Sequence, residues 1–174
     1  MSVDHTTRPN PALSGTWRLE PAGSTVEFTG RHFFFLPVRG SVPVRSGRAE
    51  LGPDGVLLRL DAAAGAAGFE SGNPQRDTAV RGPRFLDAER FPELRLTGER
   101  LLDEDGLGLA GLLEVKGRAT PVTFTVDELT VRGERAVVRA AALVDRHACG
   151  VGGMRGLVGA ELRVRVRAEF VREG

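Results

Sequence analysis

Tyrosine is absent from this 174-residue chain, and cysteine, lysine and tryptophan occur once each. The single cysteine, Cys149, excludes an internal disulfide. No apolar run approaches the ~18 residues of a membrane-spanning helix, so we expect no membrane span. A formal net charge of +1 gives no electrostatic reason to expect nucleic acid or an anionic membrane surface as a partner.

The N-terminal residues lack a basic start followed by an apolar run of about 7–15 residues. We therefore expect no secretory signal and a cytoplasmic location. Residues 1–14 are predicted to form a disordered tail, and residues 15–174 a single domain that is long enough to bury a core.

Apolar and polar residues alternate along most of the chain, which indicates strands with one solvent-exposed face. The last strand is the clearest, because Leu162, Val164, Val166, Ala168 and Phe170 alternate with charged residues. Short turns such as 52–55 separate the strands. The pattern predicts an all-β fold of about eight antiparallel strands, for which both a sandwich and a barrel remain open.

Small residues are frequent on the face predicted to point inward, namely Gly30, Gly40, Ala62, Ala64, Gly111 and Ala168. A closed eight-stranded barrel is just wide enough to be filled by side chains or to hold one small ligand. Small inward residues favour a cavity, although they could also mark tight bends. The sequence alone leaves a hollow and a filled interior open.

The segment from Gln75 to Leu96 does not alternate, and prolines 83 and 92 interrupt it. It predicts loops with two short helical turns, Asp77 to Arg81 and Asp87 to Arg90. Its large apolar side chains need a dry environment, and long loops of this kind are usually functional. We interpret the segment as a cover over the mouth of a β-barrel.

Five passages in colinear order carry a family resemblance: Trp17 to Pro21; Phe28 to His32 with Ser46-Gly47; Arg76-Asp77 with Phe85-Leu86-Asp87 and Phe91-Pro92; Leu109 to Val122; and Asp145-Arg146 with Gly150 and the last strand. Together they make the chain resemble the YceI-like family of polyisoprenoid-binding, lipocalin-like proteins. The resemblance implies an eight-stranded antiparallel lipocalin-like barrel, with the long loop and short-helix insertion covering it. It also implies an apolar tunnel that takes an isoprenoid or another long-chain lipid.

The expected ligand-binding residues follow from this resemblance, from the inward direction of alternating side chains, and from the segment interpreted as a cover. They are Phe28, His32, Phe34, Leu58, Leu60, Arg76, Asp77, Phe85, Phe91, Leu109, Leu113, Phe124 and Val164. Arg76 could meet the polar head of a lipid, since a guanidinium offers forked donors to oxyanions. The alternative is structural, with Asp77 capping the following turn and Arg76 pairing locally.

No phosphate-binding loop, nucleophile elbow or acid pair at recognisable spacing is present, so we expect neither an enzyme nor a cofactor. The scattered His32, His147 and Cys149 do not have the spacing of a zinc site, and we expect no metal. The main hypothesis is binding of a polyisoprenoid for transport, storage or sequestration. The alternative is a ligand-free barrel that acts in stress or through a protein partner. A homodimer remains open.

Overall fold

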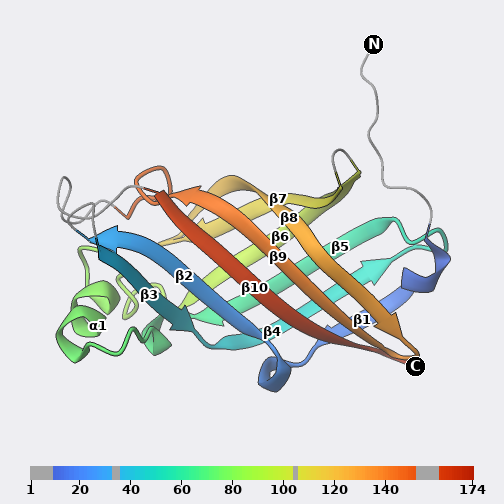
Figure 1. The fold of residues 1–174 in the computed structure, drawn as a ribbon, viewed down its shortest axis with the longest axis horizontal. Helices are drawn as coiled ribbons and strands as arrows, with labels where there is room; N and C mark the ends of the chain where they lie inside the picture. The colour runs from blue at the N-terminus through green and yellow to red at the C-terminus, as the bar shows by residue number, and fades with distance from the viewer. Residues whose placement is uncertain (1–9, 33–35, 104–105, 152–160) are drawn as a thin grey trace, which may run out of the picture.

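The computed structural model describes residues 10–32, 36–103, 106–151 and 161–174. Its strands form one antiparallel sheet that curls into a barrel (Figure 1). The strands are β1 (Gly15–Leu19), β2 (Thr25–His32), β3 (Leu36–Val42), β4 (Val44–Leu51), β5 (Leu57–Gly65), β6 (Glu93–Asp103), β7 (Leu107–Val115), β8 (Arg118–Arg132), β9 (Arg135–Asp145) and β10 (Glu161–Arg172).

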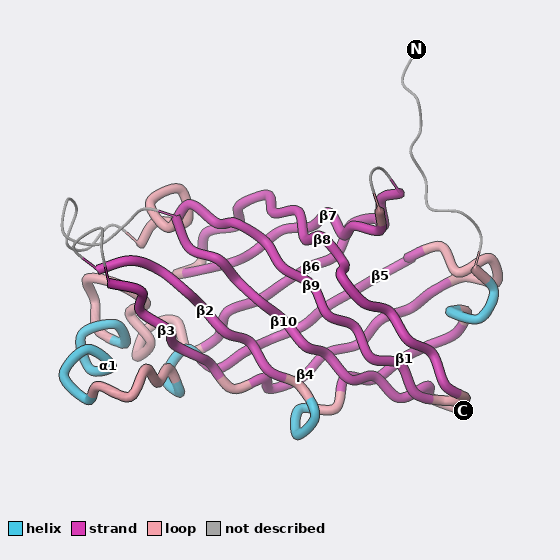
Figure 2. Tube along the Cα trace, viewed as in Figure 1, coloured by secondary structure: helices cyan, strands magenta, loops and turns pink. Residues whose placement is uncertain are grey.

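Eight strands close the barrel in the order β1-β4-β5-β6-β7-β8-β9-β10, and pairing of β1 with β10 completes the circle. The antiparallel barrel predicted from the sequence is therefore confirmed. The two further strands, β2 and β3, form a hairpin that extends the wall, because β2 pairs with the first half of β10. Figure 2 shows strands along the whole wall, helices near the two ends of the barrel, and one short helical turn at its lower edge.

Proline and glycine explain why the wall contains ten strands within the described residues and not eight. The short 3-10 helix η2 (Pro21–Gly23) separates β1 from β2. Pro43 separates β3 from β4, since it has no N–H to give to a ladder. A register shift in the β4–β5 pair between Val44 and Ser46 follows directly.

The segment between β5 and β6 contains the 3-10 helix η3 (Ala66–Gly68) and the helix α1 (Pro74–Arg81). Asn73 caps α1 by accepting a hydrogen bond from the backbone N–H of Arg76, at 3.0 Å. The predicted helical turn from Asp77 thus begins earlier, at Pro74, and the cap is Asn73 and not Asp77. No helix in the described ranges is long and apolar enough to cross a membrane.

The insertion 66–92 lies beside β3 at one end of the barrel, where α1 is seen in Figure 1. Ser41 of β3 and Glu70 exchange two backbone hydrogen bonds of 2.8 and 3.0 Å. Phe69 packs over Gly40, where a Cβ atom would collide with the phenyl ring. The guanidinium of Arg81 donates to the carbonyl of Phe69 and braces the helix against this strand-like stretch.

Residues 10–14, which the sequence analysis assigned to the tail, pack at the opposite end of the barrel. The 3-10 helix η1 (Pro11–Leu13) buries Leu13, and the backbone N–H of Asn10 donates to the carbonyl of Asp54 at 2.7 Å. The indole Nε1 of Trp17 donates to the carbonyl of Leu13 at 2.9 Å. Residues 1–9 lie outside the described part of the chain.

Candidate ligand cavity

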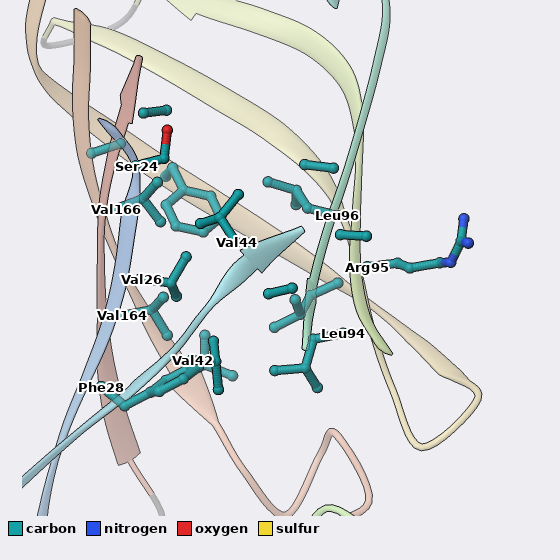
Figure 3. A pocket seen from close by; sticks show the side chains of 18 of the residues that line it. Ser24, Val26, Phe28, Val42, Val44, Leu94, Arg95, Leu96, Val164 and Val166 are labelled. Atoms are coloured by element: carbon teal, nitrogen blue, oxygen red, sulfur yellow. The ribbon is translucent and has the colours of Figure 1, made fainter. Parts of the chain in front are cut away.

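The barrel interior contains a cavity of about 670 Å³. It falls within the ~300–1,000 Å³ that is typical of small-molecule sites. Side chains from the inner faces of the strands converge on it, as Figure 3 shows for Val26, Phe28, Val42, Val164 and Val166. The insertion contributes Phe69, Asn73, Gln75, Arg76, Ala79, Val80, Phe85 and Leu86 to the lining.

The inward side chains are only partly covered by protein, which distinguishes this interior from a filled core. Among the described residues, no large side chain is completely buried. Phe28, Leu60, Leu109 and Leu113 all point into the cavity and are each of intermediate exposure. Since a filled core would bury them, the interior is hollow, and the cavity favoured by the small inward residues is present.

Eight of the residues predicted from the sequence to bind ligand line this cavity. They are Phe28, Leu60, Arg76, Phe85, Leu109, Leu113, Phe124 and Val164. They come from β2, β5, α1, the turn after α1, β7, β8 and β10, so a ligand there would touch most of the wall.

The inward position predicted for Leu58 is wrong, because its side chain is 67% exposed and lies on the outside of the barrel. The reason is a register shift in the β4–β5 pair, where Glu50 faces Arg59 but Leu51 faces Leu57. Leu58 is the extra residue, so the alternation changes phase there. Leu57 lines the cavity in its place.

Asp77 and Phe91 are not among the cavity-lining residues. Asp77 is buried in the insertion and accepts a hydrogen bond from Ser71. Phe91 is half-buried, lies close to Gly117, and has the guanidinium of Arg90 above its ring at 5.3 Å. His32 belongs to β2 by its backbone, but its side chain, like all of Phe34, lies outside what the structure describes.

The role predicted for Gly111 as a small inward residue that leaves room for ligand is also wrong. It is buried, but it does not line the cavity. A Cβ atom at this position would collide with the backbone carbonyl of Thr97 on the neighbouring strand. Gly111 therefore permits close approach of β6 and β7, next to the register shift between Gly98 and Arg100.

The lining residues that sequence reasoning missed include Trp17, Arg146 and Cys149. Trp17 alternates with Leu19 in the first strand, a signal that could have identified it. Arg146 and Cys149 lie in the turn after β9, where no periodicity directs side chains inward. Arg146 is 3% exposed, donates to the carbonyl of Val151 at 2.9 Å and lies 5.7 Å above the ring of Phe85.

The described lining is almost entirely apolar, and its few polar side chains are unevenly placed. They are Ser24, Asn73, Gln75, Arg76, Arg95, Arg146 and Cys149. Ser24 bonds to the carbonyl of Glu20, and Arg95 points away from the cavity in Figure 3 and pairs with Glu93 at 2.7 Å. No aspartate or glutamate is among the described lining residues.

Burial raises the pKa of the Cys149 thiol, which keeps it protonated at neutral pH. A protonated thiol is a poor nucleophile and a poor metal ligand. His147 does not line the cavity. Within the described ranges, no group of three histidine, cysteine, aspartate or glutamate side chains comes together as a metal site would require.

Comparison with known proteins gives a family match for the sequence and similar solved structures for the fold. A family model described as the YceI-like domain matches residues 17–170. A search of curated proteins gives no match.

Among solved structures, BcnA of Burkholderia cenocepacia matches with a TM-score of 0.72 at 18% identity, over 87% of this chain and 98% of that chain. A polyisoprenoid binding domain from Saccharophagus degradans, implicated in plant cell wall breakdown, has a TM-score of 0.65 at 10% identity, over 90% and 98%. The YCEI protein of Campylobacter jejuni has a TM-score of 0.61 at 12% identity, over 83% and 90%. At these identities the similarity establishes the fold alone.

Proposed function

The chain belongs to the YceI-like domain family, and we propose that it binds a long-chain hydrophobic ligand inside its barrel. A polyisoprenoid lipid is the class we favour, and transport, storage or sequestration is the role. The name of the Saccharophagus degradans domain, which describes it as polyisoprenoid binding, supports this choice of class.

The observation that carries the proposal is the hollow apolar interior. A cavity of about 670 Å³ whose lining is nearly all aliphatic and aromatic is unfavourable to leave filled with water. The ligand-free alternative, a barrel filled by its own side chains, loses its main support because this interior is not filled. We propose Phe28, Leu60, Phe85, Phe124 and Val164 among the ligand contacts, since all five line the cavity.

The free energy gained by burying an apolar chain can be compared with the cost of association. Burial of ~12–20 methylene-sized units at ~0.8 kcal/mol each releases a gross ~10–16 kcal/mol. Loss of rigid-body freedom costs ~4–15 kcal/mol, and ordering of the flexible chain costs more. The ~8 kcal/mol that a micromolar dissociation constant requires lies within the span of these differences, and the apolar chain supplies most of it.

We propose a binding role and not catalysis. Acid–base or nucleophilic chemistry needs an activated group within reach of the substrate. In the described lining, the candidate nucleophiles are the hydroxyl of Ser24, which donates to the carbonyl of Glu20 and has no base beside it in the lining, and the buried thiol of Cys149, whose raised pKa deactivates it. The remaining polar groups can orient a ligand but have no general base beside them among these residues.

The test compares two neighbouring alanines on β9. Ala140 lines the cavity and is half-buried, whereas Ala141 follows it on the strand and so points to the outer face. Ala140→Phe should block uptake of a fluorescent polyprenyl probe, and Ala141→Phe should leave uptake as in the parent. Circular dichroism and thermal melts check that both variants remain folded, with Ala140→Leu as a milder substitute if the larger ring overpacks the wall.

Equal uptake by both variants would place the lipid outside the barrel. A second, independent measurement is native mass spectrometry, or solvent extraction, of the protein purified from cells. We expect one long-chain lipid per chain in the parent and a reduced fraction in Ala140→Phe.

A further inference from the structure

The polar lining residues with free donors gather at one end of the cavity. Asn73, Gln75 and Arg76 belong to the first turn of α1 and its cap. At the opposite end, Trp17, Ala49 and Ala136 form an apolar cluster with Leu51, Leu60 and Phe170. Figure 1 places α1 at one end of the barrel and β1 with the end of β10 at the other.

Arg76 is the charged group available at this end. Its Nη1 makes a long hydrogen bond of 3.4 Å to the hydroxyl of Ser71, and no carboxylate of the described residues lies within ion-pairing distance of it. Ser71 gives its own proton to Asp77, so the Asp77 carboxylate already has a partner. Arg76 therefore keeps most of its five donors for another group.

The other arginines at the lining are engaged elsewhere. Arg146 is buried, donates to Val151 and stacks on Phe85. Arg95 faces outward and pairs with Glu93. Asp77 interacts electrostatically with Arg76 but does not line the cavity. Because the described lining contains no acidic side chain, a negative charge that reaches Arg76 from inside the cavity meets no carboxylate there.

We propose that the ligand is an amphiphile with an acidic head, bound with its head at Arg76 and its chain end at Trp17. This inference rests on the proposed function and adds the class and the direction of the ligand. An ionised head cannot enter the apolar interior without a large desolvation cost, whereas Arg76 is half-exposed and Asn73 and Gln75 are exposed at the rim. A phosphate and a carboxylate satisfy the same requirement.

The dimensions suit a long chain. The clusters at the two ends include Ala136 and Val144, both on β9. They are separated by eight residues of strand (144 − 136 = 8), and at ~3.3 Å per residue this separation is roughly 26 Å. The Trp17 indole is well suited to contact an apolar chain end, because its Nε1 already bonds to Leu13.

Trp17, as the only tryptophan, makes the orientation measurable. Stearate spin-labelled at carbon 5 or at carbon 16 carries the quencher near its carboxylate or near its chain end. We expect the label at carbon 16 to quench Trp17 fluorescence strongly and the label at carbon 5 to quench it weakly, with unlabelled stearate reversing both effects. Equal quenching, or stronger quenching from carbon 5, would overturn the orientation while leaving chain binding established.

The role of the head group is tested with three lipids that share the same isoprenoid tail and differ in the head: geranylgeranyl phosphate, geranylgeranoic acid and geranylgeraniol. Arg76→Gln should weaken binding of both acids about three- to tenfold, since ion pairs at an exposed rim are screened, and should leave the alcohol unchanged. Arg76→Lys should retain part of the acid affinity. Arg95→Gln is the matched control and should change none of the three.

The outcomes separate the two proposals. If none of the three lipids binds the parent protein, the proposed function fails, and the orientation fails with it. If all three bind but Arg76→Gln weakens the alcohol as much as the acids, Arg76 acts on the fold and not on a head group. If only the phosphate or only the carboxylate responds, the head is an acid of that one class.

Discussion

Ser71 donates a hydrogen bond from its hydroxyl to the carboxylate of Asp77, with 2.5 Å between Oγ and Oδ1. The bond ties the loop before α1 to the first turn of the helix. It lowers the pKa of Asp77 below its usual value, and the positive charges of Arg81 and Arg76 act in the same direction. The Asp77 carboxylate is thus held ionised beside the rim of the cavity.

Ser71→Ala should raise the pKa of Asp77 toward the ordinary ~3.9, because the hydrogen bond that favours the ionised form is lost. A carboxyl NMR titration of parent and variant measures the shift. Since the folded pKa is depressed, Asp77 contributes stability above its unfolded pKa, and this contribution is lost as the pH falls through the folded pKa. Asp77→Asn removes that acid-side dependence and serves as the control. An unchanged pKa in Ser71→Ala would show that the hydrogen bond does not hold the carboxylate.

Phe85 and Phe91 differ in burial, and we expect different costs when each is truncated. Phe85 is 8% exposed, lines the cavity and packs in a cluster with Phe69, Leu94 and Val115. Phe85→Ala should destabilise the protein by ~3 kcal/mol in urea unfolding. Phe91→Ala should cost ~1 kcal/mol, since this side chain is half-buried over Gly117. Equal melting of parent and Phe85→Ala would show that the insertion is not anchored by this ring.

The outward position of Leu58 predicts tolerance to polar substitution. Leu58→Lys should change the free energy of unfolding by less than ~0.5 kcal/mol, because the side chain is 67% exposed. Leu60→Lys, on the same strand, should destabilise the barrel by more than ~2 kcal/mol, because it places an unpaired cation in the apolar cavity. Similar stabilities for the two variants would contradict the register shift between them.

Strict alternation explains which part of the site could be predicted from the sequence. Val164 lies on a strand with an unbroken period of two, and Phe124 lies in the part of β8 that precedes the register shift between Val126 and Glu128. The inward direction of both residues therefore follows from the sequence alone. Leu58 does not follow this rule, because the extra residue appears only when β5 is paired with β4, and the residues of one strand do not reveal it. The barrel, in contrast, follows from the number and spacing of the strands together with the family resemblance.

The insertion and the turn after β9 show what a local sequence pattern can predict and what it cannot. Its helix start was recognisable, since asparagine followed by proline is typical of an N-cap and first helical position, as in Asn73-Pro74. The inward direction of Arg146 was not, because this side chain is held by packing against Phe85, which is distant in the sequence. Tertiary contacts of this kind have no local sequence signature.

The contact of Phe69 with Gly40 gives the last prediction, which concerns how the insertion is attached to the barrel. A Cβ atom at Gly40 would collide with the tip of the Phe69 ring, so Gly40→Ala should displace the ring and destabilise the protein by ~1–3 kcal/mol. Phe69→Leu shortens the side chain and should make room for the added methyl group. In the Phe69→Leu background, Gly40→Ala should therefore cost less than in the parent, and a double-mutant cycle measured by urea unfolding gives the coupling between the two positions. The substitutions remove none of the backbone donors and acceptors that join Ser41 and Glu70, so the cycle reports on the contact of the side chains. Additive costs would mean that the ring does not rest on Gly40, and that the insertion is attached to β3 by its backbone bonds alone.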